Sequence, residues 1–306
     1  MGRYLIKRLL ETIPLLIVVS FVVFLFIRLI PGDPARLVAG VDATIEEVEL
    51  LREYMGLNKP ILIQYVDYIK GILTGDLGTS LKTGDAVANM LLPRYKPTIL
   101  LAFSSMGWAL VIGLTIGIFS AVFRGRWPDY IGMLVAVIGI SLPSFWTGLM
   151  LMQLFSVNLR WLPTGGLETW KSFIMPSITL GAGIMAMIAR FSRSEMIETL
   201  RNDYIRTARA KGLNEFEVIT RHALRNSMVQ VMTVIGLQFG FLLGGSVVVE
   251  SVFSLPGLGR LLIDSINFRD YTVIQAELMI FSFQFIMINL IVDVLYGVMN
   301  PKIRYD

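Results

Sequence analysis

Few side chains in this sequence combine a reactive group with an apolar setting. Glu277 and Asp293 lie within or at the edge of a long apolar stretch near the C-terminus, and His222 is the only histidine. Ionisable groups are costly within a membrane and commonly functional there, so the two acids could line a transport pathway or pair with an arginine; a structural role is the alternative. His222 lies in a basic segment without a neighbouring nucleophile, so we favour a structural or interface role over general-base catalysis.

Several kinds of catalytic site are excluded by residue types that the chain lacks. The absence of cysteine excludes disulfides, cysteine-bound zinc, iron–sulfur clusters and thiol nucleophiles. One histidine cannot form a multi-histidine metal site, and no Gly-Lys dipeptide is present to form a phosphate-binding P-loop. A membrane-embedded hydrolase would need a catalytic pair, and Asp293 is the only aspartate in an apolar stretch. We therefore predict that the chain is not an enzyme and holds no metal or cofactor.

Uncharged residues of two kinds also interrupt the apolar stretches. The amides Gln153, Gln238, Gln284 and Asn289 could line a translocation pathway or hydrogen-bond one helix to another, and the second role is the commoner one. Glycines could permit close helix packing within the chain or against a partner; they are Gly113, Gly117, Gly240, Gly244 and Gly245.

The elements that position these residues are predicted from composition. Of the 306 residues, 55% are hydrophobic and only 16% are charged, and the mean hydropathy is +0.67. Lys and Arg number 27 against 23 Asp and Glu, a formal net charge of +4. Soluble globular proteins have about 25% charged residues, so this composition excludes an ordinary soluble domain, a disordered chain and a nucleic-acid-binding tail. We predict an all-α polytopic membrane protein embedded in a lipid bilayer.

Runs of about 20 apolar residues, the length needed to cross a bilayer, predict six transmembrane helices. The predicted spans are Thr12–Ile30, Thr98–Phe123, Tyr130–Leu159, Ser172–Ala189, Asn226–Val249 and Thr272–Val298. Pro143 is expected to kink the third span. Basic residues accumulate on one side of this arrangement, which places both termini in the cytoplasm. The basic residues are Arg3, Lys7, Arg8, Arg124, Arg126, eight from Arg190 to Arg225, Lys302 and Arg304.

The larger hydrophilic segment, residues 31–97, is predicted to be external and helical. Pro31-Gly32-Asp33-Pro34 indicates a turn, and Thr44 followed by two glutamates indicates a helix that runs through Met55 and ends at Gly56. A second helix is predicted at Ile61–Leu73, followed by a bent loop at Gly75–Ser80. This insertion could be a cap that shields helix ends or a docking surface for an external partner.

The cytoplasmic segment, residues 192–226, has helical periodicity with apolar residues on one side. Met196, Leu200 and Tyr204 recur at spacings of four residues on an otherwise charged helix, which Gly212 is expected to end. Asn214 is expected to begin a second helix. Such a pair of amphipathic helices could lie on anionic lipids, or its apolar face could enter the groove of a soluble partner.

Two stretches of this segment carry a family signature. They are Asp203-Tyr204-Ile205-Arg206-Thr207-Ala208-Arg209-Ala210-Lys211-Gly212-Leu213 and Arg221-His222-Ala223-Leu224-Arg225-Asn226. They resemble the cytoplasmic "EAA" loop of ABC-importer permeases, in the form used by dipeptide, oligopeptide and nickel permeases. Arg206-Thr207-Ala208 replaces the general Glu-Ala-Ala, and His222-Ala223-Leu224-Arg225 replaces the general Ile-x-Leu-Pro ending. Further matches lie at Arg3–Leu10, Arg28–Pro34, Gly75–Ser80, Leu142–Trp146 and Glu250–Gly259. Within the family the chain is most similar to the first permease subunits of glutathione importers.

The resemblance implies a function and a set of partners. The chain would be a permease subunit for peptides, with glutathione expected and dipeptides, oligopeptides or nickel chelates as alternatives. Its partners would be a second homologous permease, two cytoplasmic ATP-binding subunits that bind ATP and Mg, and a periplasmic substrate-binding protein, at the bacterial inner membrane. Three parts are implied: residues 1–30, the insertion 31–97, and the core 98–306 with the loop 192–226. ATPase coupling would involve Tyr204 through Leu213, His222 and Arg225. A stand-alone secondary transporter is the rival, but six spans are few for one.

Overall fold

The computed structural model describes the backbone of residues 2–29, 33–40 and 42–299, with most of their side chains. Within these ranges the chain is helical, without a β-strand beyond one isolated bridge between Thr79 and Ala86. The predicted all-α class is confirmed. Pro31, Gly32, Lys302 and Arg304 lie outside the described residues, as do the side chains of Arg3 and Lys7 and the surroundings of Gly245.

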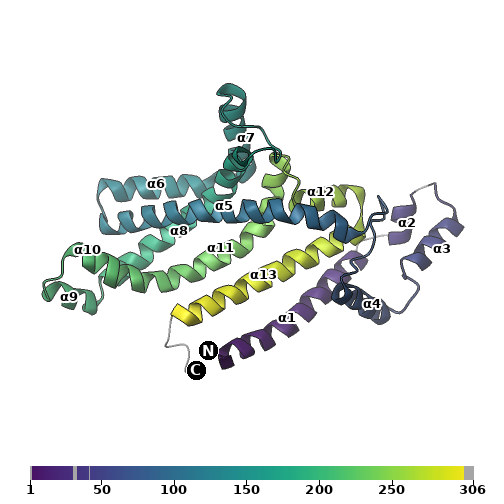
Figure 1. The fold of residues 1–306 in the computed structure, drawn as a ribbon, viewed down its shortest axis with the longest axis horizontal. Helices are drawn as coiled ribbons and strands as arrows, with labels where there is room; N and C mark the ends of the chain where they lie inside the picture. The colour runs from purple at the N-terminus through teal and green to yellow at the C-terminus, as the bar shows by residue number, and fades with distance from the viewer. Residues whose placement is uncertain (1, 30–32, 41, 300–306) are drawn as a thin grey trace.

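Long apolar helices form most of the molecule (Figure 1). They are α1 (Gly2–Arg28), α5 (Val87–Val122), α8 (Ile174–Leu200), α11 (Arg225–Val252) and α13 (Tyr271–Met299). Within the described residues four helical stretches, from α1, α5, α8 and α13, are each long and apolar enough to cross a membrane. Two bent helix pairs raise the number to six if each pair is one span. The chain is therefore a multi-pass membrane protein.

The predicted third span is broken, not merely kinked. Helix α6 (Trp127–Ser141) meets α7 (Ser144–Leu151) at an angle of 102°, and α7 continues as a π-helix over Met152–Asn158. Leu142 has an extended backbone (φ −86°, ψ 126°) because the ring of the following proline disfavours helical geometry at that position. Proline also lacks the N–H that would continue the hydrogen-bond ladder. Figure 1 shows α7 projecting away from α6 and α5.

Two long helices extend beyond the predicted spans. Helix α5 begins at Val87, well before the predicted start at Thr98, and contains Pro93 and Pro97. At about 1.5 Å per residue it is about 54 Å long, which exceeds the roughly 30 Å hydrocarbon core. Helix α8 continues past the predicted end at Ala189 to Leu200. The boundary predicted between the insertion and the core therefore falls inside one continuous helix.

The core of the bundle lies where α5, α8 and α11 pack together. Its buried side chains are Ala102, Met106, Ala109, Ile184, Met185, Ile188, Val231, Ile235 and Leu242. Gly113 and Gly117 of α5 lie against the backbone of α8, where an added Cβ would be 2.7 Å from the Met185 carbonyl oxygen and 2.6 Å from that of Ala189. Gly240 of α11 similarly lies against Phe285, whereas Gly244 has open space. Gly113 and Gly117 thus permit α5 and α8 to pack closely inside the chain.

The insertion forms short helices at one end of the long helices (Figure 1). They are α2 (Pro34–Ala39), α3 (Ile45–Tyr54) and α4 (Ile61–Thr74). Thr44 caps α3 in a reciprocal capping box with Glu47, as its sequence indicates, and Gly75 ends α4 with a left-handed φ of +79°. Asp33 caps α2, and Pro31-Gly32, the first half of the predicted turn, lies outside the described residues. The helix α12 (Leu258–Phe268) was not predicted.

Candidate functional site

The segment 192–226 folds as short helices at the end of the bundle opposite α2–α4 (Figure 1). Helix α9 (Asp203–Ala210) is followed by α10 (Glu215–Glu217) and a π-helix at Val218–Leu224, which leads directly into α11. Two helices meeting near Gly212 were predicted. Their extent was wrong, because Met196 and Leu200 belong to the end of α8 and the extended backbone of Asn202 (φ −68°, ψ 149°) separates them from α9.

The apolar face of α9 is buried within the chain. Ile205 and Ala208 pack against Met196 of α8, Ala121 of α5 and Val218 of the π-helix. Ile205 is completely buried and Ala208 is 6% exposed. The alternative in which this face enters a partner's groove is therefore wrong, because the face already forms a small core with the ends of the spans.

The opposite face of α9 and the following turn are exposed. The exposed residues are Tyr204, Arg206, Thr207, Arg209, Ala210, Lys211, Gly212 and Leu213. The Arg206 side chain is 79% exposed, and Phe216 of α10, beyond the turn, is an aromatic residue that is 75% exposed. The outward face thus combines cations with a large unburied apolar side chain.

The turn around Gly212 is held rigidly. Gly212 has a left-handed φ of +82°, as expected of a helix-ending glycine, and its N–H donates to the Arg209 carbonyl at 2.9 Å. Arg209 donates to both Glu215 carboxylate oxygens, at 2.6 and 3.2 Å, across the turn. This hydrogen-bonded ion pair lowers the pKa of the Glu215 carboxyl and raises that of the Arg209 guanidinium. Asn214 accepts a hydrogen bond from the Glu217 N–H at 2.8 Å, one half of the expected capping box.

Two polar contacts join this segment to the spans. Asn226, at the start of α11, donates to the Tyr204 hydroxyl at 3.0 Å. On α8, Arg193 donates from Nε and Nη2 to the Asp129 carboxylate at 2.6 and 2.8 Å, and Asp129 also accepts from the Gly125 N–H at 2.9 Å. This ion pair ties the start of α6 to the helix that carries the segment. It was not predicted, and the only local signal was an acid directly after the Trp127-Pro128 helix start.

The two remaining residues proposed for coupling lie at the same end. The side chain of His222 is half-buried in the π-helix, and its carbonyl accepts from Asn226. Arg225 is exposed at the first position of α11. Among the described residues no cluster of three His, Cys, Asp or Glu could hold a metal ion.

The polar residues proposed for the pathway differ in their exposure and in their partners. Asp293 is half-exposed and forms an ion pair with Arg8 of α1 at 3.2 Å, so the pairing with an arginine that the sequence suggested is present. Gln153 is exposed on the π-helix that follows α7, where it donates to Asn158 at 3.3 Å. Gln238 is half-buried on α11, and the Asn289 amide donates to the Phe285 carbonyl within α13.

Glu277 and Gln284 are the two buried members of that set. Each is less than a tenth exposed on α13, and neither side chain makes a hydrogen bond to any described residue. Neither therefore shares a hydrogen bond with Gln153 or Asp293.

A second buried polar network lies at the C-terminal end of α11. The Glu250 carboxylate accepts from the Thr98 hydroxyl at 2.7 Å and from the Arg260 N–H at 3.1 Å, and Thr98 accepts from the Leu258 N–H at 2.9 Å. Because Leu258 and Arg260 lie in the first turn of α12, the carboxylate satisfies a helix N-terminus, where negative charge is favoured. Glu250 lies in a family motif of the sequence, but the motif by itself assigns the residue no role.

The sequence matches known families along nearly its whole length. Residues 113–305 match the family described as "Binding-protein-dependent transport system inner membrane component", and residues 1–102 match its N-terminal counterpart. The chain is 53% identical over 305 residues to "Glutathione transport system permease protein GsiC" of Salmonella choleraesuis (strain SC-B67), and equally to that of Escherichia coli (strain K12). Each alignment covers 100% of both chains.

Solved structures with a similar fold are also transporter components. A chain of the inward-facing MetNI methionine ABC transporter superposes with a TM-score of 0.59 at 19% identity, covering 69% of this chain and 96% of the other. A chain of an amino acid ABC transporter with histidines gives a TM-score of 0.55 at 14% identity, covering 68% and 93%. At these identities the comparison concerns the fold alone.

Proposed function

The chain belongs to the family of binding-protein-dependent inner-membrane transport components, as a permease subunit of an ABC importer, and from this we propose that it carries glutathione. The full-length 53% identity to glutathione permeases is the observation that carries the proposal. The chain is not an enzyme, because such permeases leave ATP hydrolysis to separate subunits. Dipeptides, oligopeptides and nickel chelates are the alternative substrates.

ATPase and substrate-binding partners follow from the family in general, and we propose their composition. Two cytoplasmic ATP-binding subunits would bind ATP and Mg, a second homologous permease would complete the pathway, and a periplasmic protein would deliver the substrate. The assembly would lie in a bacterial inner membrane. Permease cavities can be large and weakly selective, so the binding protein would set much of the specificity.

The proposed topology has six spans, with α6 and α7 as one broken span and α11 as another. Both termini and the segment 192–226 would face the cytoplasm, and residues 31–97 would face outward. The location of α2–α4 at the end opposite α9 supports this arrangement (Figure 1). The insertion would shield helix ends or contact the binding protein.

We propose that the exposed face of α9, and not its apolar face, contacts the ATPase subunits. Arg206, Thr207, Ala210 and Lys211 would meet the partner's surface, with Phe216 as an anchor, because a buried aromatic surrounded by polar contacts is typical of strong interfaces. Closure of the ATPase pair around ATP would move α9, and the small core of Ile205 with Met196 would pass that movement to α8. The ion pair of Arg209 with Glu215 would keep the turn rigid.

The first experiment tests the assembly and the substrate together. The tagged chain is purified from membranes in mild detergent, its partners are identified by mass spectrometry, and ATPase activity is measured with the binding protein either empty or loaded with glutathione or a dipeptide. Co-purification of a second permease and ATPase subunits, with stimulation by the glutathione-loaded protein, is expected. Stimulation by the dipeptide-loaded protein but not by the glutathione-loaded protein would refute glutathione as the substrate. A chain that purifies alone without ATPase activity would favour a secondary transporter.

The second experiment tests which face is the interface. The absence of cysteine allows single-cysteine variants without background labelling. Ala210→Cys on the exposed face should cross-link to an ATPase subunit, whereas Ala208→Cys on the buried face should not. Asp85→Cys in the insertion should react with an impermeant thiol reagent added to intact spheroplasts, and Ala210→Cys only after lysis. Cross-linking from position 208 but not 210 would refute the proposed orientation of α9.

A further inference from the structure

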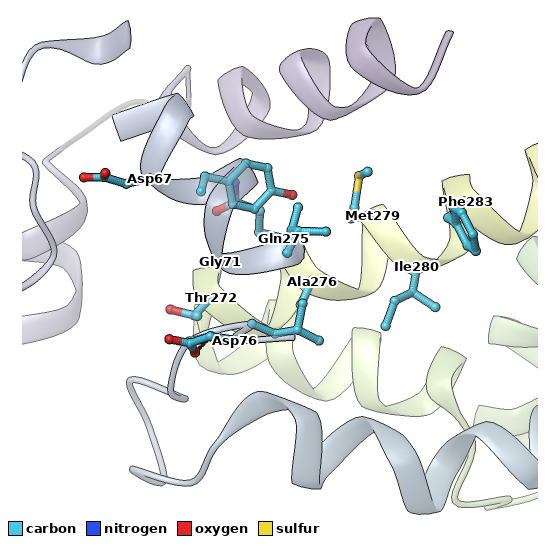
Figure 2. A pocket seen from close by; sticks show the side chains of 13 residues that line it. Asp67, Gly71, Asp76, Thr272, Gln275, Ala276, Met279, Ile280 and Phe283 are labelled. Carbon is cyan, nitrogen blue, oxygen red and sulfur yellow. Dashed lines mark hydrogen bonds between the residues drawn. The ribbon is translucent and has the colours of Figure 1, made fainter. Parts of the chain in front are cut away.

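A cavity of about 450 Å³ lies between α4 and α13 at the external end of the molecule (Figure 2). Its volume falls within the roughly 300–1,000 Å³ typical of ligand pockets. It is lined by Asp67, Tyr68, Gly71, Ile72, Asp76, Leu77, Gly78, Thr272, Gln275, Ala276, Met279, Ile280 and Phe283. None of these residues belongs to the segment 192–226 or to the buried network around Glu250.

The side chains that α13 contributes to the cavity form a stripe along one face of that helix. Thr272, Gln275, Ala276, Met279, Ile280 and Phe283 recur at three and four residues, so they share one face of the helix. From Thr272 to Phe283 the stripe extends about 16 Å at about 1.5 Å per residue. That is close to one leaflet, half of the roughly 30 Å hydrocarbon core. Because Thr272 is near the external end of α13, the stripe runs from the outer interface toward the bilayer centre.

The cavity changes from polar to apolar along this stripe. Asp76, Thr272 and Gln275 lie together at one end in Figure 2, whereas Met279, Ile280 and Phe283 extend toward the other. Gly71 and Gly78 close the polar end, since an added Cβ would be 2.7 Å from the Asp76 carbonyl oxygen or 2.8 Å from the Thr272 methyl group. An amphiphile matches this gradient, whereas a short peptide is polar along its whole length.

The other wall, α4, is suited to the membrane interface. Leu62 is 69% exposed and Leu73 is 80% exposed, yet the helix also bears Asp67 and Lys70. It is attached to the outer part of α1 by an edge-to-face contact between Phe24 and Tyr65, with ring centroids 5.3 Å apart. A short amphipathic helix with unburied leucines is typical of a segment that lies among lipid headgroups.

Two acids, Asp67 and Asp76, line the cavity. The Asp67 carboxylate is already paired with Lys59 at 2.7 Å, whereas Asp76 accepts from the Gly78 N–H at 2.9 Å through Oδ1, which leaves Oδ2 to accept from a ligand. A headgroup that carries a primary ammonium complements this acidic site, because the ammonium can donate to the Asp76 carboxylate.

We infer that this cavity binds one phospholipid of the outer leaflet whose headgroup carries a primary ammonium, with an acyl chain along the α13 stripe. The inference goes beyond the proposed transport function and takes from it only the orientation that assigns the leaflet. The lipid would fill the space between the insertion and α13 and so hold α4 against the bundle.

The test measures lipid retained by the purified transporter complex. The complex is delipidated in detergent, incubated separately with dioleoyl-phosphatidylethanolamine, dioleoyl-phosphatidylcholine or dioleoyl-phosphatidylglycerol, washed and examined by native mass spectrometry. Phosphatidylethanolamine should be retained up to about five-fold more than the other two, the range of an exposed charge contact. Asp76→Asn should remove this preference, while Asp85→Asn, a matched change at an exposed acid of the same insertion, should not.

Two further variants distinguish lipid bound in the cavity from lipid bound elsewhere on the complex. Met279→Trp fills the groove and should abolish retention of the lipid, whereas Ile291→Trp, an exposed position on the same helix, should retain it. A photo-cross-linking residue at Met279 should capture lipid. Equal retention of all three lipids by the native complex would overturn the inference. So would equal retention by the Met279→Trp and Ile291→Trp variants, or capture of the second permease at position 279. None of these readouts depends on ATPase activity, so failure here is distinguishable from failure of the proposed function.

Discussion

The ion pair of Asp129 with Arg193 gives the sharpest quantitative prediction. We expect Asp129→Ala to destabilise the chain by removing the acceptor that joins the start of α6 to α8. The carboxylate accepts three hydrogen bonds, two from Arg193 and one from the Gly125 N–H. Its loss would leave the guanidinium without its bidentate partner.

The magnitude follows from the exposure of the two side chains. Asp129 is 5% exposed and Arg193 is 28% exposed. Breaking a fully buried pair costs about 3–5 kcal/mol, whereas an exposed pair contributes less than about 1 kcal/mol. Because water still reaches part of Arg193, we expect Asp129→Ala to lower the free energy of unfolding by about 2 kcal/mol. This is roughly a 30-fold change in the ratio of folded to unfolded chain.

A double-mutant cycle separates this interaction from other effects of each substitution. The single variants Asp129→Ala and Arg193→Gln and the double variant are unfolded at equilibrium by titrating detergent micelles with sodium dodecyl sulfate. The double variant should lose about 2 kcal/mol less than the sum of the singles, within the range found for contacting residues. Additivity to within about 0.5 kcal/mol would refute the reasoning. The exchanged pair, Asp129→Arg with Arg193→Asp, should recover part of the loss.

Four other substitutions have expected outcomes. Ala208→Trp should lower the melting temperature, because overpacking a core costs about 1–3 kcal/mol, whereas Ala210→Trp should preserve melting within about 0.5 kcal/mol yet reduce uptake per ATP hydrolysed. Gly212→Ala should cost about 1 kcal/mol, since its left-handed φ of +82° disfavours a side chain, although an added Cβ meets nothing within 4 Å. Thr98→Val should cost about 2–3 kcal/mol in the same unfolding assay, because it removes partners of the buried Glu250 carboxylate and of the Leu258 N–H.

Each of these expectations has a result that would contradict it. Normal coupling of uptake to ATP hydrolysis in a stable Ala210→Trp transporter would refute the proposed interface. Unchanged unfolding of Gly212→Ala would show that the turn adapts without strain. A Thr98→Val variant as stable as the native chain would mean that the Glu250 network does not stabilise the fold.

The local features of this protein were determined by its sequence. Apolar runs set the helical class, and Thr44 with Glu47 set the start of α3 because a capping box involves neighbouring residues only. Gly212 ended α9 as expected, and Gly75 lies in the loop predicted after α4; both take left-handed φ values. Family motifs in the segment 192–226 indicated the importer family through residue identities alone.

Features that join distant segments were decided only by the tertiary structure. Thr98 and Glu250 are 152 residues apart, and Asp129 and Arg193 are 64 apart. Periodicity showed that Ile205 and Ala208 lie on an apolar face, but not whether that face is covered by a partner or by the chain itself. The same holds for the cavity between α4 and α13. A pattern of side chains determines which face of a helix avoids water, whereas the surface that covers that face depends on how all the helices pack.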